Sequence, residues 1–101
     1  MGVVVVVYVC YVFYDVPDDK LRNRIADTLK NFGLDRLQKS VFVGMMTRNR
    51  AEELALILDD LIGDMEADVR IVFVPPSFRD KVIVVRDMYS FKLKREEVMV
   101  V

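Results

Sequence analysis

The sequence contains no histidine and only one cysteine. The absence of histidine excludes Ser-His-Asp and Cys-His nucleophilic catalysis, acid–base catalysis by imidazole, and His-ligated zinc. An enzyme built from this sequence must therefore use carboxylates, tyrosine, serine, lysine, arginine or a hard metal ion. The single cysteine, Cys10, cannot form an intrachain disulfide, which fits a reducing cytoplasm. Its position in an apolar run predicts a buried side chain.

The sequence also lacks a membrane-spanning segment. The uncharged run Val3–Tyr14 (VVVVVYVCYVFY) is shorter than the about 20 apolar residues that cross a bilayer. It has no basic segment before it and no small-residue cleavage site, so we expect no signal peptide. With 101 residues, 53% hydrophobic and 31% charged, the sequence predicts one folded domain, 1–101, that is cytoplasmic and has no membrane partner.

Charge is distributed unevenly along the chain, although the net charge is only −1. Residues 16–50 contain eight Lys/Arg and four acids, residues 51–68 contain seven acids and no base, and residues 69–101 contain seven bases and four acids. An acidic section between two basic ones predicts a polarised surface, which can bind a polyanion on one side.

The uncharged run predicts the first element. Val3–Tyr14 is β-branched and aromatic throughout, which is typical of a central strand buried on both faces. Pro17 ends this strand, because proline cannot donate to a ladder and keeps the preceding residue out of helical backbone. A helix then begins at a cap provided by Asp18 or Asp19 and ends before Gly33. Its apolar residues share one face and are Leu21, Ile25, Leu29 and Phe32.

A second helix is predicted between Asn49 and Gly63. Asn49 and Glu52 have the spacing of a capping box, and Gly63 stops the helix. Its apolar stripe consists of Leu54, Ile57, Leu58, Leu61 and Ile62.

The remaining segments have strand character. Leu34–Met46 lies between the helices and forms one strand or a short pair, and Gly44 is the candidate position for a β-bulge. Further strands are predicted at Asp68–Pro76, Lys81–Val85 and Glu96–Val101.

The order of these elements predicts an α+β fold. If the segment between the helices forms two strands, the order is βαββαβ, a ferredoxin-like arrangement with an antiparallel sheet and both helices on one face. The other face then carries half of the apolar side chains of the first strand, which a monomer does not readily expose. We therefore expect a homodimer that packs sheet face against sheet face. Residues 77–101 form a C-terminal tail whose strands are expected to add to an exposed sheet edge, either of the same chain or of the partner.

An ordered set of short matches resembles a known family. The segments VFYDVPDD and LRNRIADTLKNFGLDRLQKSVFVG are similar to the CRISPR-associated protein two family, the small ferredoxin-like subunit of the prokaryotic spacer-acquisition machinery. The match runs from about Val9 to Val74. Its features are an arginine-bearing first helix, a strand ending in Tyr14-Asp15, and Gly33-Leu34 followed by Leu37-Gln38-x-Ser40-Val41-Phe42.

This resemblance implies a symmetric homodimer with a divalent metal site, usually magnesium, at which the strand-end aspartates of both protomers face each other. Asp15 is that aspartate here, as metal ligand and as catalytic residue. Members of the family act as metal-dependent endonucleases on RNA or duplex DNA in CRISPR adaptation, a form of antiviral defence. The family also bridges subunits of the CRISPR integrase and holds the incoming DNA, without a need for catalysis. The early first strand and the long C-terminal tail depart from the family pattern.

Two interpretations of Asp15 follow from the residues. In the first, Asp15 starts an Asx-type turn, which Asp-x-Pro-Asp favours. In the second, it binds magnesium, and it then needs a second carboxylate, because magnesium is held by one or two carboxylates with waters and phosphate oxygens. Asp18 and Asp19 are engaged with the helix N-terminus, whereas a two-fold axis beside Asp15 supplies a second copy. Tyr14 is expected to pack in the core.

Four cations are candidate nucleic-acid ligands. Arg22 and Arg24 flank the apolar stripe of the first helix on opposite shoulders, and Arg36 and Lys39 follow in the next strand region. Each is either a phosphate contact or a solvated flanking charge with a packed stem. Two further candidates stand at the start of the second helix, where a base opposes the macrodipole: Arg48 and Arg50.

Three functions stay open at this point. The first is a magnesium-dependent endonuclease, and the second is a non-catalytic DNA-binding scaffold that docks integrase subunits through its edges and tail. The third, unrelated to the family, is a small-ligand or regulatory module on the same fold. No RNP-like aromatic motif or helix-turn-helix signature is present, so sequence-specific base recognition is not expected.

Overall fold

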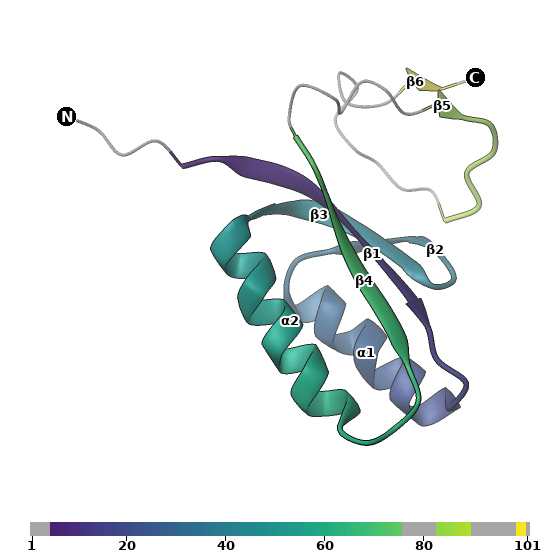
Figure 1. The fold of residues 1–101 in the computed structure, drawn as a ribbon. Coiled ribbons are helices and arrows are strands. Elements are labelled where there is room, and N and C mark those ends of the chain that lie inside the picture. Colours follow the sequence, from purple (N-terminus) through teal and green to yellow (C-terminus); the bar gives the residue numbers. More distant parts are fainter. Residues whose placement is uncertain (1–4, 76–82, 90–98, 101) are drawn as a thin grey trace.

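The computed structural model describes residues 5–75, 83–89, 99 and 100. Its main unit is a four-stranded antiparallel sheet, with the strand order β2-β3-β1-β4, and two helices (Figure 1). This confirms the α+β, ferredoxin-like βαββαβ fold, and the segment between the helices forms two strands joined by a two-residue turn at Lys39 and Ser40. The elements are β1 Val7–Asp15, α1 Asp19–Asn31, β2 Asp35–Gln38, β3 Val41–Thr47, α2 Arg48–Ile62, β4 Asp68–Val74, β5 Ile83–Val84 and β6 Met99–Val100.

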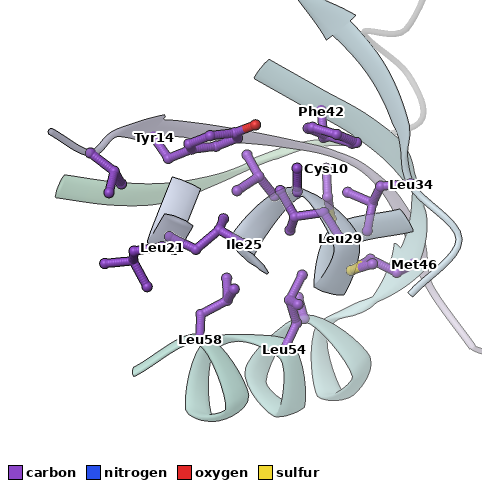
Figure 2. Packing of buried hydrophobic residues seen from close by; sticks show 14 residues of the cluster. Cys10, Tyr14, Leu21, Ile25, Leu29, Leu34, Phe42, Met46, Leu54 and Leu58 are labelled. Atoms are coloured by element: carbon purple, nitrogen blue, oxygen red, sulfur yellow. The ribbon is translucent and has the colours of Figure 1, made fainter. Parts of the chain in front are cut away.

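Both helices lie on the same face of the sheet (Figure 1). The hydrophobic core fills the space between them and the strands (Figure 2). Alternate residues of a strand point to opposite faces, so Cys10 and Tyr14 of β1 point toward the helices. In Figure 2, Ile25 and Leu29 of α1 lie in one cluster with these residues and with Leu54 of α2. Ile25, Leu29 and Leu54 are 0% exposed, and burial of each such side chain contributes about 2 kcal/mol.

The opposite face of the sheet, which we call the open face, is lined by the other strand residues. In β1 these are Val9, Tyr11 and Phe13, and the register places Val43 of β3 and Val72 of β4 beside Tyr11. Val9 and Val43 are buried, whereas Phe13 is 42% and Val72 44% exposed. The open face therefore presents apolar surface that neither helix covers (Figure 1). This agrees with the apolar pattern on both faces of the first strand.

Strand β1 begins at Val7, later than the predicted start at Val3. Val7 pairs with Thr47, the last residue of β3, and the pairing with β4 reaches only to Val9. Residues 5 and 6 therefore have no neighbouring strand in the four-stranded sheet, and both are exposed. Residues 3 and 4 of the predicted strand lie outside the described residues.

Helix α1 starts and ends as the sequence predicts. Asp18 is the N-cap, and its carboxylate accepts a 2.8 Å hydrogen bond from the Leu21 amide. At the other end Gly33 has a φ of 88°, and the Leu34 amide donates to the Leu29 carbonyl at 3.1 Å. This is a Schellman motif, in which a residue with left-handed backbone closes the helix. Glycine is required there because a side chain disfavours positive φ.

The start of α2 differs from the expectation. Thr47 is the N-cap, and its Oγ1 accepts a 3.2 Å hydrogen bond from the Arg50 amide. Asn49 lies inside the first turn, so the capping box predicted for Asn49 and Glu52 is wrong. The reason is that β3 continues to Thr47 and the helix follows at once, which leaves Thr47 as the last residue with extended backbone. The helix ends before Gly63, as predicted.

The predicted bulge at Gly44 is also wrong. Gly44 pairs in regular register with Cys10, and the irregularity lies in β2, between Arg36 and Gln38. Gly44 instead permits a close approach of the segment that follows α1, because a Cβ there would lie 3.2 Å from the Leu34 side chain. The glycine therefore reflects packing rather than strand irregularity.

Beyond β4, the structure describes two short strands, β5 and β6, which pair with each other in parallel. They correspond to parts of the predicted strands Lys81–Val85 and Glu96–Val101. In the described part of the tail they form a sheet of their own and do not extend the four-stranded sheet. Residues 76–82, 90–98 and 101, most of the predicted tail 77–101, lie outside the described residues. Neither α1 nor α2 has the length and apolar character needed to span a bilayer.

The N-cap of α2 can be tested by stability measurements. Thr47→Ala removes the acceptor of the Arg50 amide and should lower the free energy of unfolding by about 1 kcal/mol. Asn49→Ala is the matched control, because Asn49 is exposed inside the helix, where alanine has the higher helix propensity. It should leave the stability unchanged or raise it slightly. Urea unfolding measures both variants, and a larger loss for Asn49→Ala than for Thr47→Ala would contradict the assignment.

Candidate functional site

Asp15 is the last residue of β1, and its side chain lies on the open face because its neighbour Tyr14 points into the core. The turn that follows is organised by Asp18, which caps α1. The Asp15 side chain is exposed and makes no hydrogen bond or ion pair within the part of the chain that the structure describes. Of the two interpretations of Asp15, the turn-forming role therefore has no hydrogen bond to support it.

A second carboxylate lies directly beside Asp15. The antiparallel register pairs Asp15 with Asp68, the first residue of β4, and Phe13 with Arg70. Residues paired in this way share a face, and their Cα atoms are about 5 Å apart. No pattern along the sequence links Asp68 to Asp15. The two residues are brought together by the antiparallel pairing of β1 and β4, which places the end of β1 beside the start of β4.

Arg70 neutralises Asp68. The guanidinium of Arg70 donates two hydrogen bonds to the Asp68 carboxylate, from Nε at 2.9 Å and from Nη2 at 3.1 Å. These bonds lower the pKa of the Asp68 carboxyl below its usual range. Like charges opposite each other on neighbouring strands destabilise a sheet, so this fork offsets the repulsion between Asp68 and Asp15.

Tyr14 connects Asp15 to the β2–β3 turn. Its ring is buried against Phe42, as expected from the sequence, and burial raises the pKa of its hydroxyl, although nearby guanidinium groups partly oppose this. The Tyr14 hydroxyl donates to the Lys39 carbonyl at 3.3 Å, and the Tyr14 amide donates to the Ser40 carbonyl at 3.1 Å. The two-residue turn is thus held next to the end of β1.

Arg36 and Lys39 lie in and beside the β2–β3 turn, next to the end of β1. The Arg36 guanidinium donates to the Lys39 carbonyl at 2.8 Å and lies 5.0 Å from the centroid of the Phe42 ring. The Lys39 side chain is exposed and has no ion pair among the described residues. The Lys39 side chain is therefore available to bind an anion. The Arg36 guanidinium instead stabilises the β2–β3 turn through its hydrogen bond.

Arg22 and Arg24 differ in the same way. Arg22 donates to the Val16 carbonyl at 2.9 Å and pairs with Asp19, so it fixes the chain between β1 and α1. Arg24 is exposed, and its guanidinium has no carboxylate partner in the described ranges. The structure therefore brings Arg22, Arg36 and Lys39 to the end of the sheet that carries Asp15, and leaves Arg24 on the outer surface of α1.

The two arginines at the start of α2 have structural partners. Arg48 lies 4.8 Å from the Phe73 ring centroid and 3.6 Å from a Glu52 carboxylate oxygen. Arg50 lies 4.0 Å from the centroid of a phenylalanine ring at the end of α1 and pairs with Glu53 at 3.1 Å. Cation–π contact and ion pairing account for both side chains without a ligand.

Cys10 is not a nucleophile of this site. It is 0% exposed in the core, and burial raises the pKa of its thiol to about 11. The thiol is therefore protonated at neutral pH, and its burial agrees with the prediction.

The donor set around Asp15 fits a hard cation better than a zinc ion. Among the described residues no three His, Cys, Asp or Glu side chains are grouped to hold a metal ion. Asp15 offers a free carboxylate, and the neighbouring Asp68 is engaged by Arg70. Magnesium is commonly held by one or two carboxylates and completes its shell with water and phosphate oxygens. The described residues of one chain could therefore supply only part of the ligand set of a magnesium ion.

The fold and the charged residues at the end of β1 together define a class of protein. It is a small ferredoxin-like domain with a free carboxylate at the end of its first strand and cations nearby. The family model of the CRISPR associated protein Cas2 matches residues 7–82. This match extends from the start of β1 past the end of β4, so the chain belongs to the Cas2 family. It also confirms the resemblance found in the short segments between β1 and β3.

Similar proteins and a solved structure support membership in the Cas2 family. The chain is 40% identical over 60 residues to CRISPR-associated endoribonuclease Cas2 2 of Pyrobaculum aerophilum, a match that covers 59% of this chain and 66% of that protein. It is 35% identical over 60 residues to a CRISPR-associated endonuclease Cas1/endonuclease Cas2 fusion of Thermoproteus tenax, covering 59% of this chain and 23% of the fusion. A crystal structure of Cas2 is similar with a TM-score of 0.68 and 28% identity, over 86% of this chain and 97% of that one. The matches span 50% to 66% of the length of the first curated relatives.

The effect of Arg70 on the pKa of the Asp68 carboxyl can be tested by mutation. Arg70→Gln removes the charged fork and should raise the pKa of the Asp68 carboxyl toward its ordinary value of about 4. Because the folded-state pKa is lowered, the pair stabilises the fold above that ordinary value, and this stabilisation is lost as the pH falls below it. Titration of the carboxyl carbons by NMR measures the shift.

Arg24→Gln is the control for this titration, because it removes an equal charge that does not contact Asp68. It should leave the pKa of Asp68 at the wild-type value. An Asp68 pKa that is the same in Arg70→Gln and in the wild type would show that the fork does not form in solution.

Proposed function

We propose that this chain is a homodimeric, magnesium-dependent endonuclease of CRISPR adaptation, in antiviral defence, that hydrolyses phosphodiester bonds of RNA or duplex DNA. The observation that carries the proposal is the free carboxylate of Asp15 at the end of β1, on the open face of the sheet. Membership in the Cas2 family and the endoribonuclease names of relatives support it.

The proposed dimer forms through the open face. Phe13, Met45 and Val72 are between 42% and 44% exposed there, beside Tyr11. Apolar side chains from three neighbouring strands favour burial against a second, self-complementary copy. A two-fold axis near the end of β1 would bring Asp15 close to the partner's Asp15, and two carboxylates then complete the partial magnesium site.

In this proposal the charged residues of the chain have different roles. Asp15 holds the cation, and Lys39 and Arg24 offer exposed charges to the phosphate backbone. Arg22 and Arg36 keep the β1–α1 connection and the β2–β3 turn in place and add positive charge beside the carboxylate. When bound, magnesium supplies Lewis-acid polarisation of the phosphoryl oxygen and a lower pKa for a water ligand.

The second candidate is a non-catalytic scaffold that binds nucleic acid and bridges integrase subunits. The unpaired charges of Arg24 and Lys39, within the described ranges, favour backbone binding without sequence recognition. The Cas1/Cas2 fusion among the relatives supports Cas1 as the partner subunit. Such a scaffold needs the dimer and the cations, but it does not need a metal at Asp15.

The endonuclease proposal is tested by Asp15→Asn. This variant keeps the shape of the side chain and removes its charge, so it should reduce magnesium-dependent cleavage of RNA and duplex DNA to background. Dimerisation and nucleic-acid binding, measured by sedimentation and gel shift, should be retained. Arg24→Gln is the complementary variant. It should weaken binding and lower the salt dependence of the binding constant by about one unit of slope, while cleavage stays magnesium-dependent.

The outcomes separate the two candidates. Undiminished cleavage by Asp15→Asn would contradict the assignment of the metal site. Wild-type protein that binds duplex DNA in a salt-dependent, sequence-indifferent way but never cleaves with magnesium would favour the scaffold.

A further inference from the structure

We propose that Arg70 is a phosphate-binding residue of the site at Asp15, and that Asp68 holds the Arg70 guanidinium in position to bind a non-bridging oxygen of a phosphodiester. This inference rests on the proposed function, because it adds a contact to the same nucleic-acid site. Neither Arg70 nor Asp68 is among the candidates that the sequence pattern indicates.

Arg70 lies on the open face of the sheet, close to Asp15. The register pairs Asp15 with Asp68 and Phe13 with Arg70, so Arg70 is the diagonal neighbour of Asp15 across β1 and β4. Diagonal neighbours on one face are about 7–8 Å apart, which a long side chain spans. The Arg70 guanidinium is turned toward the start of β4, because it donates to Asp68. An anion held by a cation at Asp15 therefore lies within reach of this guanidinium.

The Arg70 guanidinium keeps a second pair of donors free. Arginine has five N–H groups in one plane. Nε and Nη2 each use one of them on the Asp68 carboxylate, at 2.9 and 3.1 Å, and the remaining N–H groups have no acceptor in the described part of the chain. One free N–H on Nη1 and one on Nη2 are parallel and form a fork that matches a phosphate group. The Arg70 side chain is 73% exposed, so this fork is open to solvent.

The proposed dimer leaves this fork accessible. In the four-stranded sheet β4 is an edge strand, and Arg70 is near its start, at the end of the sheet that carries Asp15. The apolar surface that is proposed to meet the second copy extends from Phe13 away from this end, to Val72 and Met45. Arg70 therefore lies at the border of that surface, and the borders of protein interfaces are polar and accessible to solvent.

Asp68 keeps Arg70 from neutralising Asp15. A direct pair between Arg70 and Asp15 would favour the sheet, because opposite charges on neighbouring strands attract and two carboxylates opposite each other repel. Instead the guanidinium is bound by Asp68, and Asp15 has no ion pair among the described residues. The Asp15 carboxylate thus stays free for a cation, and the guanidinium is fixed beside it. Asp68 is a positioning residue in this proposal.

Stability of the sheet alone does not account for the arrangement. An exposed ion pair contributes little to stability, and a charge on an edge strand also hinders pairing with another sheet. Arg70 paired directly with Asp15 would provide both effects without a second acid. The unfavourable placement of Asp68 opposite Asp15 therefore indicates that the orientation of the guanidinium has a function.

A phosphodiester is complementary to both groups at once. It has two non-bridging oxygens, of which one can face a cation held by Asp15 while the other accepts from the free fork of Arg70. The same contact stabilises the negative charge on the phosphoryl oxygens during hydrolysis, since the donors are already oriented when the reaction begins.

The phosphate contact is tested by binding, in full-length chains that all carry Asp15→Asn so that the probe is not cleaved. Arg70→Gln should weaken binding of a short RNA strand and of a DNA duplex by about tenfold in fluorescence anisotropy. Asp68→Asn combined with Arg70→Gln restores the net charge of the Asp15→Asn parent but not the fork, so it should still bind more weakly than the parent. Arg48→Gln is the matched control and should bind as the parent does, because Arg48 is a similarly exposed, ion-paired arginine on α2.

The positioning role of Asp68 is tested by cleavage with Asp15 intact. Asp68→Asn removes an acid from the site, so KM should be unchanged or lower, whereas kcat should fall by about tenfold because Arg70 loses its fixed orientation. Arg70→Lys keeps the charge without the fork and should show the same separation of kcat from KM. A purely structural ion pair would change stability without separating these constants.

The proposed role of Arg70 is overturned by parent-like affinity in Arg70→Gln, by parent-like affinity in the charge-restored double variant, or by an equal loss in Arg48→Gln. An unchanged kcat in Asp68→Asn overturns the role of Asp68. Failure of the endonuclease proposal is distinguishable, because the binding experiment uses neither metal nor cleavage. If the wild type does not cleave, the affinities alone decide whether Arg70 binds phosphate.

Discussion

Strand β1 carries apolar side chains on both of its faces, and the other elements are arranged around this constraint. It is a central strand, between β3 and β4, so both of its faces need a covering layer. On one face α1 and α2 provide that layer and form the core with Cys10 and Tyr14. On the open face, neither α1 nor α2 covers Phe13 and its neighbours across the sheet. A second copy supplies the covering layer in the proposed dimer.

The position of Asp15, the proposed metal ligand, follows from the same strand. Alternation along β1 sends Tyr14 into the core, and this directs Asp15 to the open face at the end of the strand. Tyr14 in turn holds the β2–β3 turn through the Lys39 carbonyl. Arg70 neutralises Asp68, so the two paired strand ends tolerate two carboxylates side by side. Packing in the core thus determines how the charged groups at the end of β1 are arranged.

Short sequence patterns predicted the features that depend only on residues close together in the chain. Apolar periodicity identified both helices, and Gly33 was predicted as a closing residue because few others adopt its positive φ. The capping box at Asn49 was wrong because the true N-cap depends on where β3 ends, which is a property of the sheet. Asp15 was recognisable as a candidate by its place after an uncharged run. Asp68 was not, because cross-strand register is absent from a linear pattern.

In the proposed metal site, two copies of Asp15 share one metal ion. The most direct test is the number of divalent ions bound per chain, measured by titrating the metal-free dimer with Mn²⁺ and detecting free ion by electron paramagnetic resonance. We expect a site that saturates at one ion for two chains and is lost in Asp15→Asn. Saturation at one ion per chain, or a site that persists in Asp15→Asn, would contradict the proposed metal site.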